Sequence, residues 1–88
     1  MYEVFLERRA ERDLKKLSTE MFNRIIPHLK ALSENPKPPG CRKITGSKSD
    51  WRIRIGDYRI IYEIDALINA RKKAVKVMRI RHRKEAYK

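Results

Sequence analysis

The chain has 88 residues, of which 41% are hydrophobic and 39% charged, and 23 Lys and Arg against 11 Asp and Glu give it a net charge of +12. A chain of this length predicts a single domain, residues 1–88, with a thin core. Three features are missing: an apolar run near the roughly 20 residues that span a bilayer, the apolar stretch of a signal peptide, and a second cysteine to pair with Cys41. We therefore expect a cytoplasmic protein without disulfides whose partner is a polyanion rather than a membrane.

The N-terminal residues predict a strand and a first helix. Residues 2–6 ("YEVFL") alternate as a strand does. Residues 7–17 follow as a helix with a narrow apolar stripe, formed by Ala10, Leu14 and Leu17. A stripe this narrow is typical of a helix that lies on the surface of a sheet.

A second helix is predicted over residues 20–34, with Ser18 or Thr19 as its cap. Pro27 falls inside its apolar pattern. An interior proline costs about 3 kcal/mol in a regular helix, so we expect either a kink near residues 23–27 or two shorter helices.

The rest of the chain predicts three strands, over residues 51–55, 58–64 and 74–81. A long loop over residues 36–50 precedes them, and a turn at 69–74 separates the last two. The final residues, "HRKEAYK", predict one short helical turn.

The stretch "WRIRIGDYRIIYEI", residues 51–64, carries the most specific pattern. Gly56 and Asp57 suit a two-residue type II′ turn. That turn fixes five cross-strand pairs: Ile55–Tyr58, Arg54–Arg59, Ile53–Ile60, Arg52–Ile61 and Trp51–Tyr62. Because side chains alternate along a strand, one face is core and consists of Trp51, Ile53, Ile55, Tyr58, Ile60 and Tyr62.

The other face of this hairpin gathers Arg52, Arg54 and Arg59. Like charges directly opposite one another repel by up to about 1 kcal/mol, and folding does not require the arrangement. It suits binding of phosphate by planar guanidinium groups. The alternative is an ordinary solvated face that Glu63 or Asp50 partly neutralises.

The last strand adds Arg79, Arg81 and Arg83 to the same basic zone. Its alternation is ambiguous, because Val75 and Val77 as well as Met78 and Ile80 read as buried. Periodicity therefore leaves open which of these arginines faces the cluster.

Two residues near the C-terminus can carry protons. His82 can act as a general acid or base, and Tyr87 is a phenol that can hydrogen-bond a ribose hydroxyl. The alternatives are an inert surface histidine and an apolar anchor. The sequence has no metal-ligand spacing and no glycine-rich phosphate loop, so we expect neither a metal nor a cofactor.

Together, the element order and the segments "GDYRIIYEI" and "RIRHRKEAY" resemble the RelE/ParE superfamily of toxins from toxin–antitoxin systems, most closely its RelE branch. The resemblance spans nearly the whole chain. It implies an α+β fold in which an N-terminal strand and a two-helix hairpin pack on a mainly antiparallel sheet. It also implies metal-free cleavage of mRNA in the ribosomal A site, neutralisation by an acidic RelB-like antitoxin, and contact with DNA only through that antitoxin.

Three site residues follow from the resemblance. Arg59 in "DYR" matches the arginine that stabilises the scissile phosphate, Arg81 matches a second catalytic arginine, and Tyr87 matches the tyrosine near the reacting nucleotide. The substrate-binding candidates are Arg52, Arg54, Arg83 and Lys43.

The sequence departs from the family at Arg52 and Arg54, where relatives often carry lysines. A lysine with a lowered pKa can act as a base, whereas a guanidinium with a pKa above about 12 cannot. If the chain cleaves RNA, the base must come from elsewhere, and His82 and Tyr87 are the candidates.

Two other functions stay open at this point. ParE-like proteins share the fold but poison DNA gyrase, which requires no ribonuclease site. A non-catalytic RNA- or ribosome-binding module would bind with a steep salt dependence and leave RNA intact.

Overall fold

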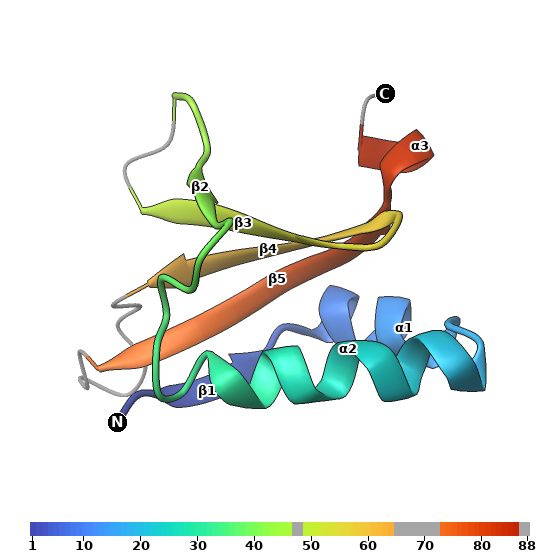
Figure 1. The fold of residues 1–88 in the computed structure, drawn as a ribbon, viewed down its shortest axis with the longest axis horizontal. Coiled ribbons are helices and arrows are strands. Elements are labelled where there is room, and N and C mark those ends of the chain that lie inside the picture. The colour runs from blue at the N-terminus through green and yellow to red at the C-terminus, as the bar shows by residue number, and fades with distance from the viewer. Residues whose placement is uncertain (47–48, 65–72, 87–88) are drawn as a thin grey trace.

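The computed structural model describes residues 1–46, 49–64 and 73–86, and it contains one sheet with its two longer helices below it in the view of Figure 1. In chain order the elements are β1 (Glu3–Leu6), α1 (Arg8–Lys15), α2 (Thr19–Ala31), β2 (Arg42–Lys43), β3 (Asp50–Ile55), β4 (Tyr58–Ile64), β5 (Ala74–His82) and α3 (Arg83–Ala86). The strands form one sheet in the order β1-β5-β4-β3-β2. All neighbours are antiparallel except β1 and β5, which are parallel. The expected α+β fold is confirmed.

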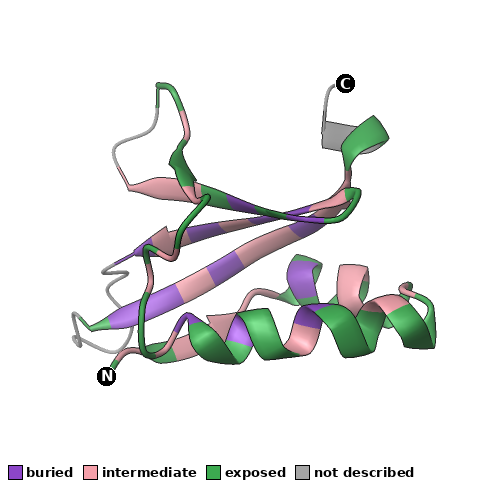
Figure 2. Cartoon of the chain, viewed as in Figure 1, coloured by how far each residue is buried: buried purple, intermediate pink, exposed green. Residues whose placement is uncertain are grey.

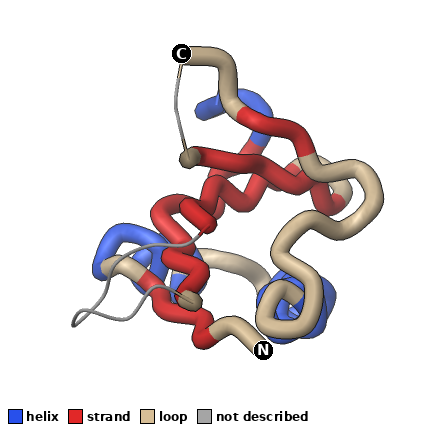
Figure 3. Tube along the Cα trace, turned by 90° about the vertical axis from the view of Figure 1, so that its left-hand side faces the viewer, coloured by secondary structure: helices blue, strands red, loops and turns tan. Residues whose placement is uncertain are grey.

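The core lies between the sheet and the two long helices. Figures 1 and 3 show α1 and α2 at the end of the sheet that β1 and β5 form, away from β2, and Figure 2 shows exposed residues on the outer faces of these helices. The fully buried side chains come from both layers and include Ile25, Leu32, Ile60, Tyr62, Val75 and Val77. The opposite face of the sheet lacks a helical cover among the described residues, and β2 and α3 rise on either side of it (Figure 1).

The helix α2 runs unbroken through Pro27, so the expectation of two shorter helices is wrong. Ser18 caps it, because its Oγ accepts the backbone N–H of Met21 at 3.1 Å. Pro27 has no backbone N–H, so the carbonyl of Asn23, four residues earlier, receives no helical hydrogen bond. Both residues are exposed. Solvent can therefore hydrate that carbonyl, which lowers the cost of the proline.

The β3–β4 hairpin has the predicted register, with Ile55 opposite Tyr58 and Arg54 opposite Arg59. Gly56 adopts a φ of +58°, which the first central position of such a turn requires. An added Cβ on Gly56 would lie 3.1 Å from Nη1 of Arg24, so α2 reaches across to this turn. The hairpin is thus fixed by its turn, and the Arg24 side chain of α2 lies beside that turn.

A bulge explains the ambiguous alternation of the last strand. Ile61 pairs with Arg79, but Tyr62 pairs with Val77, so Met78 is an extra residue in β5. The inserted residue reverses the alternation. Val77 and Ile80 can consequently both be buried although they are three positions apart.

The predicted loop over residues 36–50 contains a short strand, which the sequence did not indicate. Arg42 and Lys43 pair with Arg52 and Trp51 as the edge strand β2. Two basic residues give no periodicity, so only the sheet beside them makes this segment a strand. Most of the predicted turn at 69–74 lies outside the described residues.

None of the helices in the described part of the chain is long and apolar enough to cross a membrane.

Candidate functional site

A row of three arginines crosses the middle of the sheet on its helix-free face. Arg59 of β4 lies directly opposite Arg54 of β3 on one side and Arg81 of β5 on the other. Neighbouring strands are about 4.8 Å apart, so the three backbone positions span about 10 Å. The bulge at Met78 brings Arg81 into this row, because without it the alternation of β5 would be reversed at this point. We call Arg54, Arg59 and Arg81 the arginine row.

The middle member of the row is buried, which the sequence did not predict. Arg59 is only 7% exposed, whereas Arg52 and Arg54 are exposed. A buried guanidinium needs hydrogen bonds and compensating charge to offset its lost hydration. Arg59 is therefore largely shielded from solvent, whereas the exposed side chains of Arg52 and Arg54 can reach toward a ligand.

A cleft of about 270 Å³ opens over β3 and β4 and contains part of this row. Its lining residues are Gly40, Arg42, Arg52, Arg54 and Arg59. Four of the five carry a guanidinium group, and the described lining includes no carboxylate. Such a cleft suits an anion with several oxygens, because each guanidinium offers paired N–H donors.

Arg42 is a member of this cleft that the sequence did not indicate. It lies opposite Arg52 across the β2–β3 pair and so shares its face. Lys43, the predicted phosphate ligand, instead lies opposite Trp51, on the face that packs toward the core. The basic segment "CRK", residues 41–43, indicated that a cation lies in this region. Only the register of β2 decides that Arg42, and not Lys43, lines the cleft.

Arg83 is not brought into the cleft. Its backbone N–H donates to the carbonyl of Asp57 at 2.7 Å, and its Nε lies 3.9 Å from Oδ1 of the same residue. Both side chains are more than half exposed, so the ion pair itself is weak. The contact ties the start of α3 to the β3–β4 turn.

His82, next to Arg81 in β5, lies outside the cleft over β3 and β4. It pairs across the strands with Tyr58, and the two rings meet edge to face with centroids 5.2 Å apart. Its Nδ1 accepts the backbone N–H of Lys84 at 3.2 Å, which caps α3. The alternation of β5 turns this ring to the face opposite that of Arg81. Tyr87, the other proton-carrying candidate, lies outside the described residues.

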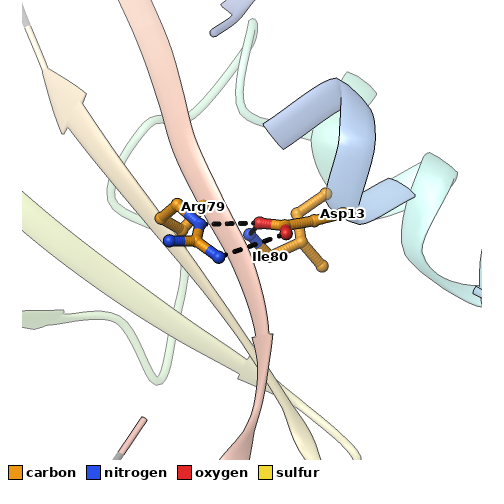
Figure 4. Close-up of polar contacts among 3 residues, drawn as sticks. All are labelled: Asp13, Arg79 and Ile80. Carbon is orange, nitrogen blue, oxygen red and sulfur yellow. Dashed lines mark hydrogen bonds and ion pairs between the residues drawn. The ribbon is translucent and has the colours of Figure 1, made fainter. Parts of the chain in front are cut away.

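A carboxylate on α1 holds the end of β5 (Figure 4). Oδ2 of Asp13 accepts Nε–H of Arg79 and the backbone N–H of Ile80, both at 2.9 Å, and Oδ1 accepts Nη2–H of Arg79 at 3.3 Å. The parallel strand β1 pairs only as far as Val77. Asp13 therefore replaces the missing strand partner beside Arg81.

The charge of Asp13 is favoured in this setting. Burial raises its pKa, but the hydrogen bonds from Arg79 and Ile80 and the positive charges of Arg79 and Arg81 outweigh that effect. The net result is a pKa below the usual value for aspartate. Asp13 is thus a structural anion rather than a proton carrier.

A larger hollow of about 470 Å³ lies between the end of α1 and the ends of β4 and β5. Its lining includes Asp13, Lys16, Leu17, Tyr58, Arg81 and His82. Within residues 1–46, 49–64 and 73–86, no group of three or more His, Cys, Asp or Glu side chains could hold a metal ion. The arrangement combines cations with aromatic rings and offers electrostatic stabilisation of a phosphate.

The family of this chain follows from its sequence as a whole. Residues 4–87 match the family described as the ParE toxin of the type II toxin–antitoxin system, parDE. The chain belongs to this toxin family. It is therefore a toxin of the RelE/ParE type, and the superfamily expected from its motifs is confirmed. Among curated proteins, no sequence matches it significantly.

Solved structures of RelE toxins share the fold of this ParE-family toxin. The archaeal RelE–RelB complex from Pyrococcus horikoshii matches with a TM-score of 0.76 and 25% identity, over 93% of this chain and 94% of that chain. The RelBE2 complex from Mycobacterium tuberculosis matches with a TM-score of 0.75 and 25% identity, over 93% and 98%. The isolated Escherichia coli RelE toxin, at 21% identity, has a TM-score of 0.75 over 93% and 84%. These matches agree with the RelE-like layering of two helices on the sheet.

Proposed function

We propose that this toxin is a ribosome-dependent endoribonuclease that cuts mRNA in the A site. The observation that carries the proposal is the arginine row, with Arg54, Arg59 and Arg81 opposite one another on three adjacent strands. Three cations with this spacing on a helix-free face suit a phosphate that gains negative charge during a reaction.

The chemistry needs no nucleophile from the protein, because RNA supplies its own. The 2′-hydroxyl oxygen attacks the adjacent phosphorus, and the bond from phosphorus to the 5′-oxygen of the next nucleotide breaks. One proton leaves the 2′-hydroxyl and one reaches the departing 5′-oxygen. The products are a 2′,3′-cyclic phosphate and a 5′-hydroxyl. The arginine row would stabilise the phosphorane-like transition state.

Dependence on the ribosome follows from the weakness of acid–base catalysis at this site. Arginine does not give up its proton near neutrality, and the His82 ring packs edge to face on Tyr58, on the face of β5 opposite that of Arg81. Tyr87 is the proposed proton carrier, on the strength of the family motif. Such a site gains most from a partner that holds the RNA in an in-line geometry, which is the contribution of positioning.

The proposed partner in the resting state is an acidic RelB-like antitoxin. The Pyrococcus horikoshii and Mycobacterium tuberculosis structures are complexes of toxin with antitoxin, and a net charge of +12 favours an acidic ligand. Any contact with DNA would then pass through the antitoxin. Its action on ribosomes would take place in the cytoplasm.

Primer extension on mRNA in a purified translation reaction tests the nuclease. The variants are Arg54→Ala and Arg81→Ala, and Arg8→Ala on α1 is the matched control, since Arg8 is exposed and lies outside the cleft. Loss of one preorganised donor to a charged transition state costs about 10²–10³ in rate. We expect losses of that order in the first two variants and little change in Arg8→Ala. Intact mRNA with a folded wild-type protein refutes the nuclease.

The second candidate is inhibition of DNA gyrase, and the description of the matching family as ParE favours it. It requires no cleavage chemistry, and the arginine row would then be a docking surface. Trapped gyrase–DNA cleavage complexes, formed by the wild-type chain while mRNA stays intact, would support this candidate instead.

A further inference from the structure

The helix α1 carries a second basic surface that the arginine row does not include. Arg9, Arg12 and Lys16 follow one another at i, i+3 and i+7, which places them on one face of the helix. All three side chains are exposed. With a rise of 1.5 Å per residue, they extend over about 10 Å of helix. We call these three residues the α1 strip.

The α1 strip borders a hollow that leads to the candidate site. With Asp13 and Arg79, its residues line a depression of about 190 Å³. Asp13, Lys16 and Arg79 also line the 470 Å³ hollow that reaches Arg81. A basic surface therefore runs from α1, across the edge of β5, to one end of the arginine row.

The cations of the α1 strip form no ion pair with the carboxylates that the structure describes. Asp13 is the one carboxylate among the described residues that line the depression, and it already accepts hydrogen bonds from Arg79 and Ile80 (Figure 4). In the described ranges, no carboxylate lies within ion-pair distance of Arg9, Arg12 or Lys16. The negative end of the helix dipole favours cations in the last turn of α1, whereas its positive end disfavours Arg9 in the first turn. A ligand that supplies negative charge is the missing counterpart.

We propose that the α1 strip binds the phosphate backbone of folded RNA on the ribosome, while the arginine row acts on the mRNA. The choice of partner rests on the proposed function. A run of exposed arginine and lysine side chains along one helix face is the usual footprint of phosphate contact. Two adjoining basic surfaces, one on α1 and one on the sheet, would allow the toxin to hold the ribosome and the substrate together.

The test compares two charge reversals on the same helix. Arg9→Glu/Lys16→Glu changes the α1 strip. Arg8→Glu/Lys15→Glu makes the same change in net charge with the same residue types, at positions turned about 100° round the helix from Arg9 and Lys16. All four positions are exposed, so both variants should fold. Binding of each full-length variant to mRNA-programmed ribosomes with an empty A site is measured as a function of salt.

We expect the strip variant to bind at least about tenfold more weakly than the wild type. The slope of its log affinity against log salt concentration should be smaller in magnitude by roughly two, about one for each cation removed. The Arg8→Glu/Lys15→Glu control should bind nearly as the wild type does. Equal weakening of both variants means that only net charge acts, and unchanged binding of the strip variant means that α1 does not dock; either result overturns the proposal. An equal loss of affinity for duplex DNA overturns the assignment to folded RNA.

Cleavage is scored separately on the same samples. If ribosome binding depends on the strip but the wild-type toxin leaves mRNA intact, the docking surface is supported and the nuclease is refuted. If the wild-type toxin cuts mRNA but both variants bind the ribosome equally, the nuclease is supported and the docking surface is refuted.

Discussion

Removal of the Asp13 carboxylate should loosen the end of β5. In Asp13→Ala the Arg79 guanidinium and the Ile80 backbone N–H both lose their acceptor. In Asp13→Asn the amide oxygen can still accept from Ile80, but the ion pair is lost. The two variants therefore separate the hydrogen bond to the strand edge from the charge.

The size of the effect follows from the exposure of the pair. The side chain of Asp13 is 13% exposed and that of Arg79 is 28% exposed. Hydrogen bonds to charged groups contribute about 1.5–3 kcal/mol each, and water that reaches Arg79 reduces the loss. We expect the free energy of unfolding to fall by about 2–3 kcal/mol in Asp13→Ala and about 1–2 kcal/mol in Asp13→Asn. In a domain of this size, the alanine variant should lose about 10–20 °C in Tm.

Urea unfolding, followed by Trp51 fluorescence and circular dichroism, measures these differences. The pH dependence gives an independent check. The folded pKa of Asp13 lies below its ordinary value of 3.8, so the ionised carboxylate contributes its full stability above that value and loses it as the pH falls through the folded pKa. The gap between wild type and Asp13→Asn should therefore stay constant from pH 7 to about 4 and narrow below that.

A double-mutant cycle with Arg79→Met provides the control, because the two losses should not add if the residues act together. A cost below about 0.5 kcal/mol for Asp13→Ala, the usual range for an inconsequential surface change, would refute the reasoning. So would independent effects of the two substitutions.

Three further substitutions probe the scaffold, each by urea unfolding. Gly56→Ala should cost about 1–2 kcal/mol, because its φ is +58° and the new Cβ would meet Arg24 at 3.1 Å; an unchanged midpoint contradicts this. Tyr62→Phe should cost about 1 kcal/mol, since its hydroxyl donates to the carbonyl of Pro36 at 2.8 Å. Burial raises the pKa of Tyr62, so wild type should lose stability above pH 10 more steeply than this variant does. Ser18→Ala removes the cap of α2 and should cost about 1 kcal/mol, whereas no loss would assign the capping to backbone alone.

The β3–β4 hairpin could be predicted in full because its geometry is local. A two-residue turn at Gly56 leaves one register, and the register decides which side chains share a face. The opposition of Arg54 and Arg59 followed directly. The burial of Arg59 did not, since it depends on what β5 and its neighbours bring to the same face.

The features that the sequence could not predict depend on distant partners. The bulge at Met78 accompanies the change of partner from β1 to the Asp13 carboxylate along β5. The edge strand β2 exists because β3 lies beside it, and it selects Arg42 rather than Lys43 for the cleft. The α1 strip was visible as a charge pattern, but only the contact between α1 and β5 connects it to Arg81.

The parallel pairing of β1 with β5 has a consequence for how the toxin folds during its synthesis. Strands from the two ends of the chain lie side by side, and β5 sits between β1 and β4. During synthesis β5 is the last strand to emerge, so a nascent chain has neither a partner for β1 nor the third arginine of the row. Contacts of such long sequence separation also form slowly. The incomplete polypeptide therefore lacks both the paired β1 strand and the complete arginine row, and both form only after β5 has been synthesised and has docked between β1 and β4.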